Sequence, residues 1–210
     1  MYDLTDVLPD VEVDPGTNVL IAGAPLTGKR QLAYEILASG AEREEGSIVV
    51  TTKDSATKVL SRFESATDGA SVEDVDVGIV DCVTKQRGMG VIEDDRRIKY
   101  ASSPVDMTGI GIKLSEFLQE FYEVRGHARN RILLHSVSTL LMYSNLQTVF
   151  RFLHVFTGRI QSGEALGVYV IDSTAHEDQT MNTLKQLFDG VIEVRQGDGA
   201  RPEVRTAGLV

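Results

Sequence analysis

Short apolar runs recur along the chain, separated by longer segments in which apolar residues have a different spacing. Runs of about five apolar residues between polar turns predict buried strands. Because such strands alternate with helical segments, the pattern predicts βαβ units and an α/β fold with a mostly parallel sheet flanked by helices. The predicted strands lie at residues 18–22, 47–51, 75–81, 131–134, 167–171, 191–194 and 203–206.

The segments between the strands carry the periodicity of amphipathic helices. In residues 108–126, Leu114, Phe117, Leu118 and Phe121 fall on one helical face, which we expect to pack on the sheet. Further helices are predicted at residues 31–39, 56–63, 145–163 and 181–188.

Two segments show neither the apolar runs of buried strands nor the periodicity of helices. Residues 83–97 mix glycine with clustered charge and predict a surface loop, whereas residues 197–199, Gly-Asp-Gly, predict the turn of a C-terminal β-hairpin. A chain of 210 residues with 42% hydrophobic content is long enough for one sizeable core and short for two. We therefore expect a single domain over residues 1–210.

Charge and targeting signals narrow the function classes. The net charge of −10 disfavours binding of nucleic acid or anionic lipid through the overall field. The first residues lack the features of a signal peptide, and no segment approaches the roughly 18 uninterrupted apolar residues of a membrane span. We expect a cytoplasmic protein without membrane insertion. The one cysteine, Cys82, and the scattered histidines have no metal-ligand spacing, so no metal site is predicted.

A glycine-containing loop follows the first strand and precedes the first helix. Its spacing, GxxxxGK, is that of a Walker A phosphate-binding loop. Such a loop needs glycines where the backbone curls around an anion, inward-pointing amides at a helix N-terminus, and a lysine that reaches the terminal phosphates. The predicted nucleotide-binding residues are Gly23, Ala24, Pro25, Leu26, Thr27, Gly28, Lys29 and Arg30.

The eighth loop position departs from this motif. It normally carries serine or threonine, whose hydroxyl oxygen coordinates magnesium, but in this chain it is Arg30. A guanidinium group has donors only and cannot bind a cation. Arg30 either neutralises phosphate charge directly or lies along the helix surface.

With this loop, the chain resembles the KaiC-like ATPases of the RecA superfamily, which include archaeal signalling proteins and recombinase paralogues. Pro25 gives the loop the Gly-x-Pro-x-Thr-Gly-Lys form of that family. Residues 131–141 are similar to its Walker B strand and the serine-containing segment after it, and residues 188–194 are similar to its closing strand. The resemblance implies a RecA-like P-loop NTPase fold with ATP as the ligand. The acidic, arginine-rich composition resembles that of proteins from salt-loving archaea.

Further residues depart from the pattern at positions to which the resemblance gives catalytic roles. His135 stands where an aspartate ends the Walker B strand, and Lys53 stands where an acidic residue activates water. Asp54 is a candidate base or an ordinary helix cap. Asp172 occupies the position of a polar sensor of the terminal phosphate, with an ordinary turn as the alternative. The departures at Arg30, His135 and Lys53 together predict weak or absent hydrolysis of ATP and leave the role of magnesium open.

Three functions follow from these observations. The first is a nucleotide-binding or vestigial regulatory module that signals to a protein partner. The second is an active ATPase, completed by Asp54 or by an acid from a neighbouring copy in a homo-oligomer. The third is a recombinase-like mediator of DNA repair. The charge disfavours this third function, and residues 142–145 and 175–180, which correspond to recombinase DNA-binding loops, contain no lysine or arginine.

Overall fold

The computed structural model describes residues 1–67, 75–88, 92, 94–197 and 202–209. The strands are β1 (Tyr2–Asp3), β2 (Glu12–Val13), β3 (Asn18–Gly23), β4 (Gly46–Thr51), β5 (Val77–Asp81), β6 (Ile98–Tyr100), β7 (Asn130–His135), β8 (Leu166–Asp172), β9 (Gly190–Arg195) and β10 (Glu203–Ala207). Strands β1 and β2 form a small sheet of their own. The other strands form an eight-stranded sheet in the order β10-β9-β3-β8-β7-β4-β5-β6. Its pairs are parallel except for β9 and β10, which form an antiparallel hairpin.

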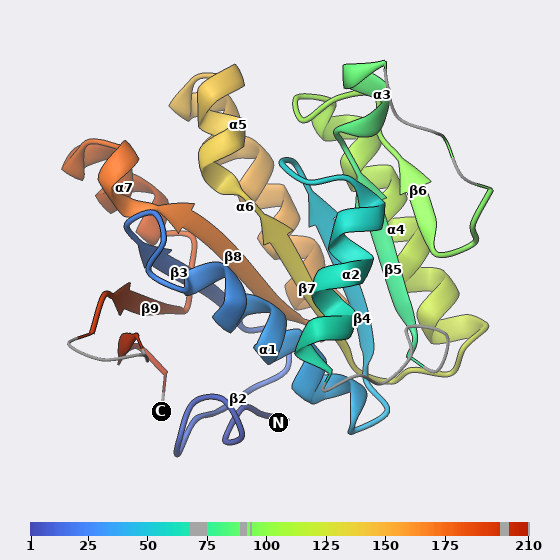
Figure 1. Cartoon of the computed structure of the whole chain (residues 1–210), viewed down its shortest axis with the longest axis horizontal. Coiled ribbons are helices and arrows are strands. Elements are labelled where there is room, and N and C mark those ends of the chain that lie inside the picture. The colour runs from blue at the N-terminus through green and yellow to red at the C-terminus, as the bar shows by residue number, and fades with distance from the viewer. Residues whose placement is uncertain (68–74, 89–91, 93, 198–201, 210) are drawn as a thin grey trace.

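Helices cover both faces of the large sheet (Figure 1). Helices α1 (Lys29–Ala41) and α2 (Ala56–Ala66) lie on the near face in this view, and α4 (Met107–Glu123) and α6 (Leu146–Ser162) lie behind. The remaining helical segments are α3 (Thr84–Arg87), α5 (Val137–Tyr143), η1 (Ser173–Ala175) and α7 (Asp178–Lys185). Among the described residues, no helix has the length and apolar character needed to cross a membrane.

The core is divided by the sheet into two apolar clusters. In β7, Leu133 packs with the cluster under α1 and α2, whereas Ile132 and Leu134 pack with the cluster under α4 and α6. Successive side chains of a strand point to opposite faces. Since both faces are covered, these parallel strands appear in the sequence as uninterrupted apolar runs.

The carboxyl ends of the central strands meet along one edge of the sheet. Strand β3 lies beside β8, which lies beside β7, which in turn lies beside β4. The segments that follow these strands are therefore neighbours, although they are far apart in sequence. Such edges are where open α/β sheets bind ligands.

The structure confirms the predicted strands and the C-terminal hairpin, and it corrects three details. Residues 83–97 are not simply a loop, because Thr84–Arg87 form α3. The short edge strand β6 begins at Ile98, immediately after this segment. Helix α5 was not predicted. The helix expected at residues 181–188 begins at Asp178 and ends at Lys185. Residues 198 and 199 of the predicted turn lie outside the described residues, as do 89–91 and 93 of the predicted loop.

Candidate phosphate-binding site

The loop between β3 and α1 has a tight backbone that is partly left-handed. Gly28 has a φ of 89° and Leu26 a φ of 65°, both in the left-handed region. At Gly23, a Cβ atom would lie 2.4 Å from the carbonyl oxygen of Val194, so only glycine fits. The Thr27 hydroxyl donates to the carbonyl of Ala24 at 2.9 Å and closes the turn. The backbone thus curls tightly just before the N-terminus of a thirteen-residue helix.

The loop lysine is held by two internal partners. Lys29 is only 7% exposed. Its Nζ donates to the Ala24 carbonyl at 2.8 Å and forms an ion pair with Asp172, at the end of β8. The predicted sensor position therefore lies directly against the predicted phosphate lysine. A phosphate that binds Lys29 has to compete with this carboxylate.

Asp54 forms the centre of a cluster of cations. It follows β4, is 5% exposed, and lies 2.8 Å from Lys58 Nζ. Arg62 Nε and Arg30 Nη1 approach its other oxygen at 3.6 and 3.7 Å. Burial acts to raise the pKa of Asp54, but the hydrogen bond from Lys58 and the charges of Lys58 and Arg62 outweigh it and hold this pKa below its usual value. A carboxylate stabilised in this way is a weak proton acceptor.

His135, at the end of β7, is buried beside this cluster. It is 4% exposed, and its Nδ1 has no hydrogen-bond partner. Burial lowers the pKa of His135 to about 4, although Asp54 acts in the opposite direction. The imidazole at the predicted Walker B position is therefore neutral at neutral pH and contributes no charge.

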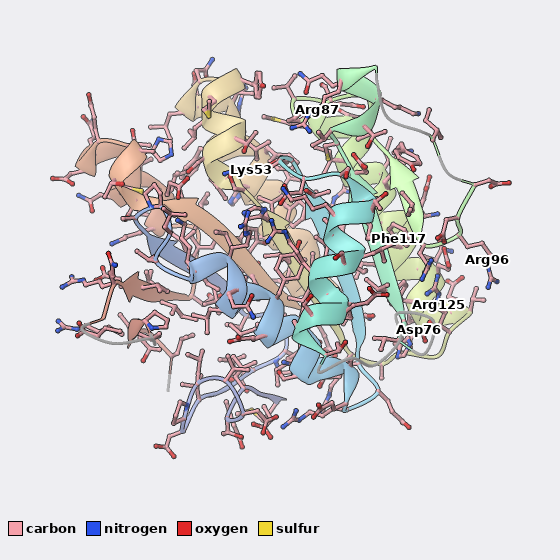
Figure 2. The ribbon with its side chains drawn as sticks, viewed as in Figure 1. Lys53, Asp76, Arg87, Arg96, Phe117 and Arg125 are labelled. Atoms are coloured by element: carbon pink, nitrogen blue, oxygen red, sulfur yellow. The ribbon has the colours of Figure 1, made fainter. Side chains whose placement is uncertain are left out.

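A cavity of about 400 Å³ lies beside these groups. It lies between the loop, α1, α2 and the ends of β7 and β8, and four cationic side chains line it: Lys29, Arg30, Lys53 and Arg62. Asp172 is the one carboxylate among its described lining residues. Figure 2 shows Lys53 at the carboxyl-end edge of the sheet. In a chain with a net charge of −10, a cavity lined in this way concentrates positive potential.

The residues present do not fit a magnesium ion. Magnesium prefers oxygen ligands, yet Asp172 is paired with Lys29, and Asp54 is surrounded by three cations. Arg30 offers donors only. Throughout the described part of the chain, no group of three histidine, cysteine or acidic residues could hold a metal ion.

Sequence reasoning identified the loop, His135, Lys53, Asp54 and Asp172, and the structure brings all of them to one edge of the sheet. Sequence reasoning did not indicate that Lys58, Arg62 or Tyr34 belongs to the site. A signal was present, since Lys58 and Arg62 are four apart on one face of the predicted helix and Asp54 comes just before that helix. The distant histidines His127 and His154 do not line this cavity.

Comparisons with known proteins support the fold. The model of a family of unknown function, DUF7504, matches residues 16–194. No curated protein matches the sequence. The uncharacterized protein PH0321 from Pyrococcus horikoshii, solved in complex with an unknown peptide, superposes with a TM-score of 0.71 at 12% identity, covering 98% of this chain and 97% of that one. The KaiC-like protein PH0186 from Pyrococcus horikoshii OT3 superposes with a TM-score of 0.59 at 16% identity, covering 100% of this chain and 84% of that one.

At these identities the likeness concerns the fold alone. It confirms the predicted α/β architecture, with a mostly parallel sheet flanked by helices, a C-terminal hairpin and a KaiC-like structural neighbour.

Proposed function

We propose that this chain, which belongs to the family of unknown function DUF7504, binds a nucleoside triphosphate such as ATP at the loop Gly23–Arg30 and acts as a regulatory module with little hydrolysis of its own. The observation that carries the proposal is the cavity beside the loop, where four cations face one carboxylate in an otherwise acidic protein. An anion with several charges is the ligand that such a cavity favours.

The loop and the cavity supply complementary contacts. The loop amides at the start of α1 donate to the phosphate groups, and Lys29 provides a mobile cation once it leaves Asp172. Arg30 and Arg62 line the same cavity from the neighbouring helices α1 and α2. The phosphate chain would thus run from the loop toward Asp54 and His135.

The same geometry argues against efficient hydrolysis. Phosphoryl transfer to water requires a metal ion that neutralises developing charge and a group that orients the nucleophile. Asp54, the candidate base, has its charge stabilised by Lys58, Arg62 and Arg30. His135 is neutral and buried. Binding without turnover suits a protein whose ligand state is sensed by a partner.

A partner surface adjoins the site. A second cavity, of about 480 Å³, shares Lys53, Ser136 and Asp172 with the first and reaches α5, where Met142 and Tyr143 are 79% and 58% exposed. Large exposed apolar side chains next to a ligand site are typical of interaction surfaces. A protein partner or a second copy would contact this region, and the unknown peptide bound to PH0321 is consistent with protein recognition by this fold.

Calorimetric titration of the protein with ATP tests the proposal. Wild-type protein should bind ATP, and Lys29→Ala should weaken binding by about tenfold or more, because it removes a charged contact. Lys113→Ala removes a lysine from α4, on the opposite face of the sheet, and should bind as the wild type does. Absence of binding, or equal binding by Lys29→Ala, would overturn the proposal. Phosphate release measured in parallel should remain near the buffer rate.

A further inference from the structure

We infer that this site takes its polyphosphate ligand free of divalent metal, with Arg30 and Arg62 supplying the positive charge that a magnesium ion would otherwise supply. The inference rests on the proposed nucleotide site and specifies the chemical form of the ligand. The residues around the cavity offer cations where a magnesium ion would need oxygen ligands.

The buried carboxylate of Asp54 lies at ion-pair distance from two arginines, although Asp54 Oδ2 and Arg62 Nε form no hydrogen bond. Arg30 comes from the first turn of α1 and Arg62 from α2, and both approach the same oxygen of Asp54, at 3.7 and 3.6 Å. Lys58 lies 2.8 Å from the other oxygen. Three cations thus surround one carboxylate, so the cluster keeps an excess of positive charge. A magnesium ion placed beside it would be repelled, whereas a phosphate would be attracted.

Each guanidinium retains donors for a ligand. A guanidinium carries five N–H donors, and contact with one carboxylate oxygen engages only part of them. Arg30 and Arg62 both line the cavity, with side chains 38% and 28% exposed. The planar array of donors matches the oxygens of a phosphate group.

Two further polar groups of the cavity lack partners. The hydroxyl of Tyr34 and Nδ1 of His135 have no hydrogen-bond partner, although the residues are 2% and 4% exposed. Both residues line the cavity. Buried polar atoms without partners are costly, and each of them can accept a partner such as a water molecule, an ion or a ligand. A tyrosine hydroxyl and a neutral imidazole with its proton on Nδ1 both donate to phosphate oxygens.

Metal-free and metal-bound nucleotide differ in the negative charge that they present to the cavity. Free ATP carries more negative charge than its magnesium complex, and the metal occupies the phosphate oxygens that the arginines would contact. The cationic cavity should therefore prefer the free form. The expected result is the opposite of the magnesium requirement of an ordinary P-loop site, in which the eighth-position hydroxyl coordinates the ion.

The test is calorimetric titration of the full chain with ATP, once in EDTA and once in excess magnesium chloride. Wild-type protein should bind at least as tightly in EDTA. Arg30→Thr restores the hydroxyl of the usual loop and should weaken binding in EDTA by about tenfold or more, since a charged contact is lost. Its affinity in magnesium should fall less. Arg62→Gln should act in the same direction, and thermal melting of both variants verifies that they are folded.

The outcomes separate this inference from the proposal on which it rests. Tighter wild-type binding in magnesium, with Lys29→Ala impaired, overturns the metal-free mode and leaves the nucleotide site standing. The control is Arg151→Thr, which replaces an exposed arginine on α6, on the other side of the sheet. If Arg30→Thr changes ATP affinity no more than this control does, Arg30 does not contact the ligand. Failure to bind ATP in either buffer overturns both statements.

Discussion

His135 gives the stability of this protein a pH dependence that can be worked out from its environment. An unfolded histidine titrates near its ordinary value of 6.5, whereas burial lowers the pKa of folded His135 to about 4. Asp54 acts to raise this pKa, while the nearby cations Arg30, Lys53 and Arg62 lower it. Below pH 6.5 the unfolded chain therefore binds a proton that the folded protein does not yet bind. The stabilising contribution is complete above pH 6.5 and is lost as the pH falls toward 4.

The magnitude follows from the gap between the two pKa values. A gap from 6.5 to about 4 corresponds to at most ~3 kcal/mol of unfolding free energy. Between about pH 7 and pH 4.5 the linkage relation gives a loss of ~2 kcal/mol. Because the side chain is 4% exposed, solvent screening reduces this figure little. A loss of this size is a large part of the stability of a typical domain.

Urea unfolding followed by circular dichroism at a series of pH values measures this dependence. The wild type should lose ~2 kcal/mol between about pH 7 and pH 4.5, and His135→Asn should lose correspondingly less, whatever its own stability. Five carboxylates also have lowered pKa values, but most of their contribution to stability is lost below this range, and the wild type and the variant share it; these carboxylates are Asp3, Asp54, Asp76, Asp95 and Asp106.

The matched control is His176→Gln. Burial also lowers the pKa of His176, against the charge of Asp172, but this residue is more exposed. The variant should therefore keep most of the wild-type pH dependence. If His135→Asn loses as much stability as the wild type over this range, burial does not hold His135 neutral, and the Walker B position carries a proton in the folded protein.

Three further predictions concern the loop and its ligand. Asp172→Asn should tighten ATP binding by up to about tenfold in calorimetry, because the ligand no longer competes for Lys29; unchanged or weaker binding would show that Asp172 does not oppose the ligand. Gly23→Ala should destabilise the protein by ~1–3 kcal/mol in urea unfolding, since its Cβ would clash with backbone, whereas Gly158→Ala, where a Cβ meets nothing within 4 Å, should not. Fluorescence anisotropy with labelled single-stranded DNA should show no salt-sensitive binding, because the chain carries a net charge of −10; binding that falls steeply with salt would revive the DNA-repair hypothesis.

The sequence predicted the fold well because the burial that makes this sheet leaves a local trace. Strands covered on both faces, such as β7 with Ile132, Leu133 and Leu134, appear as apolar runs. Strand β6 left no such trace, since it has three residues at the sheet edge and is defined by its pairing with β5. Helix α5 was missed because seven residues are too few for a periodicity; its start is fixed by Ser136, whose hydroxyl accepts from the amide of Thr139.

From the spacing of residues alone, the site was predictable only where its parts are close in sequence, whereas Lys53, His135 and Asp172 were identified through the family resemblance. The loop residues could be recognised because their spacing is fixed by one turn of backbone. The pairing of Lys29 with Asp172 could not, because it depends on β3 lying beside β8, a feature of strand order that the apolar pattern does not encode. Likewise, the cluster around Asp54 joins two helices that line the cavity, through Arg30 and Arg62.

The charges of this site depend on one another. Without its cations, Asp54 would be a buried, unpaired carboxylate, which proteins tolerate poorly. Arg30 and Arg62 supply that pairing, and the neutral His135 avoids adding a second charge. Even so, the cavity keeps more positive charge than the pairing needs, and like charges in a partly enclosed space destabilise the free protein. Under the proposed function, an anionic ligand would relieve that repulsion, and binding would restore the stability that the free protein forgoes at this site.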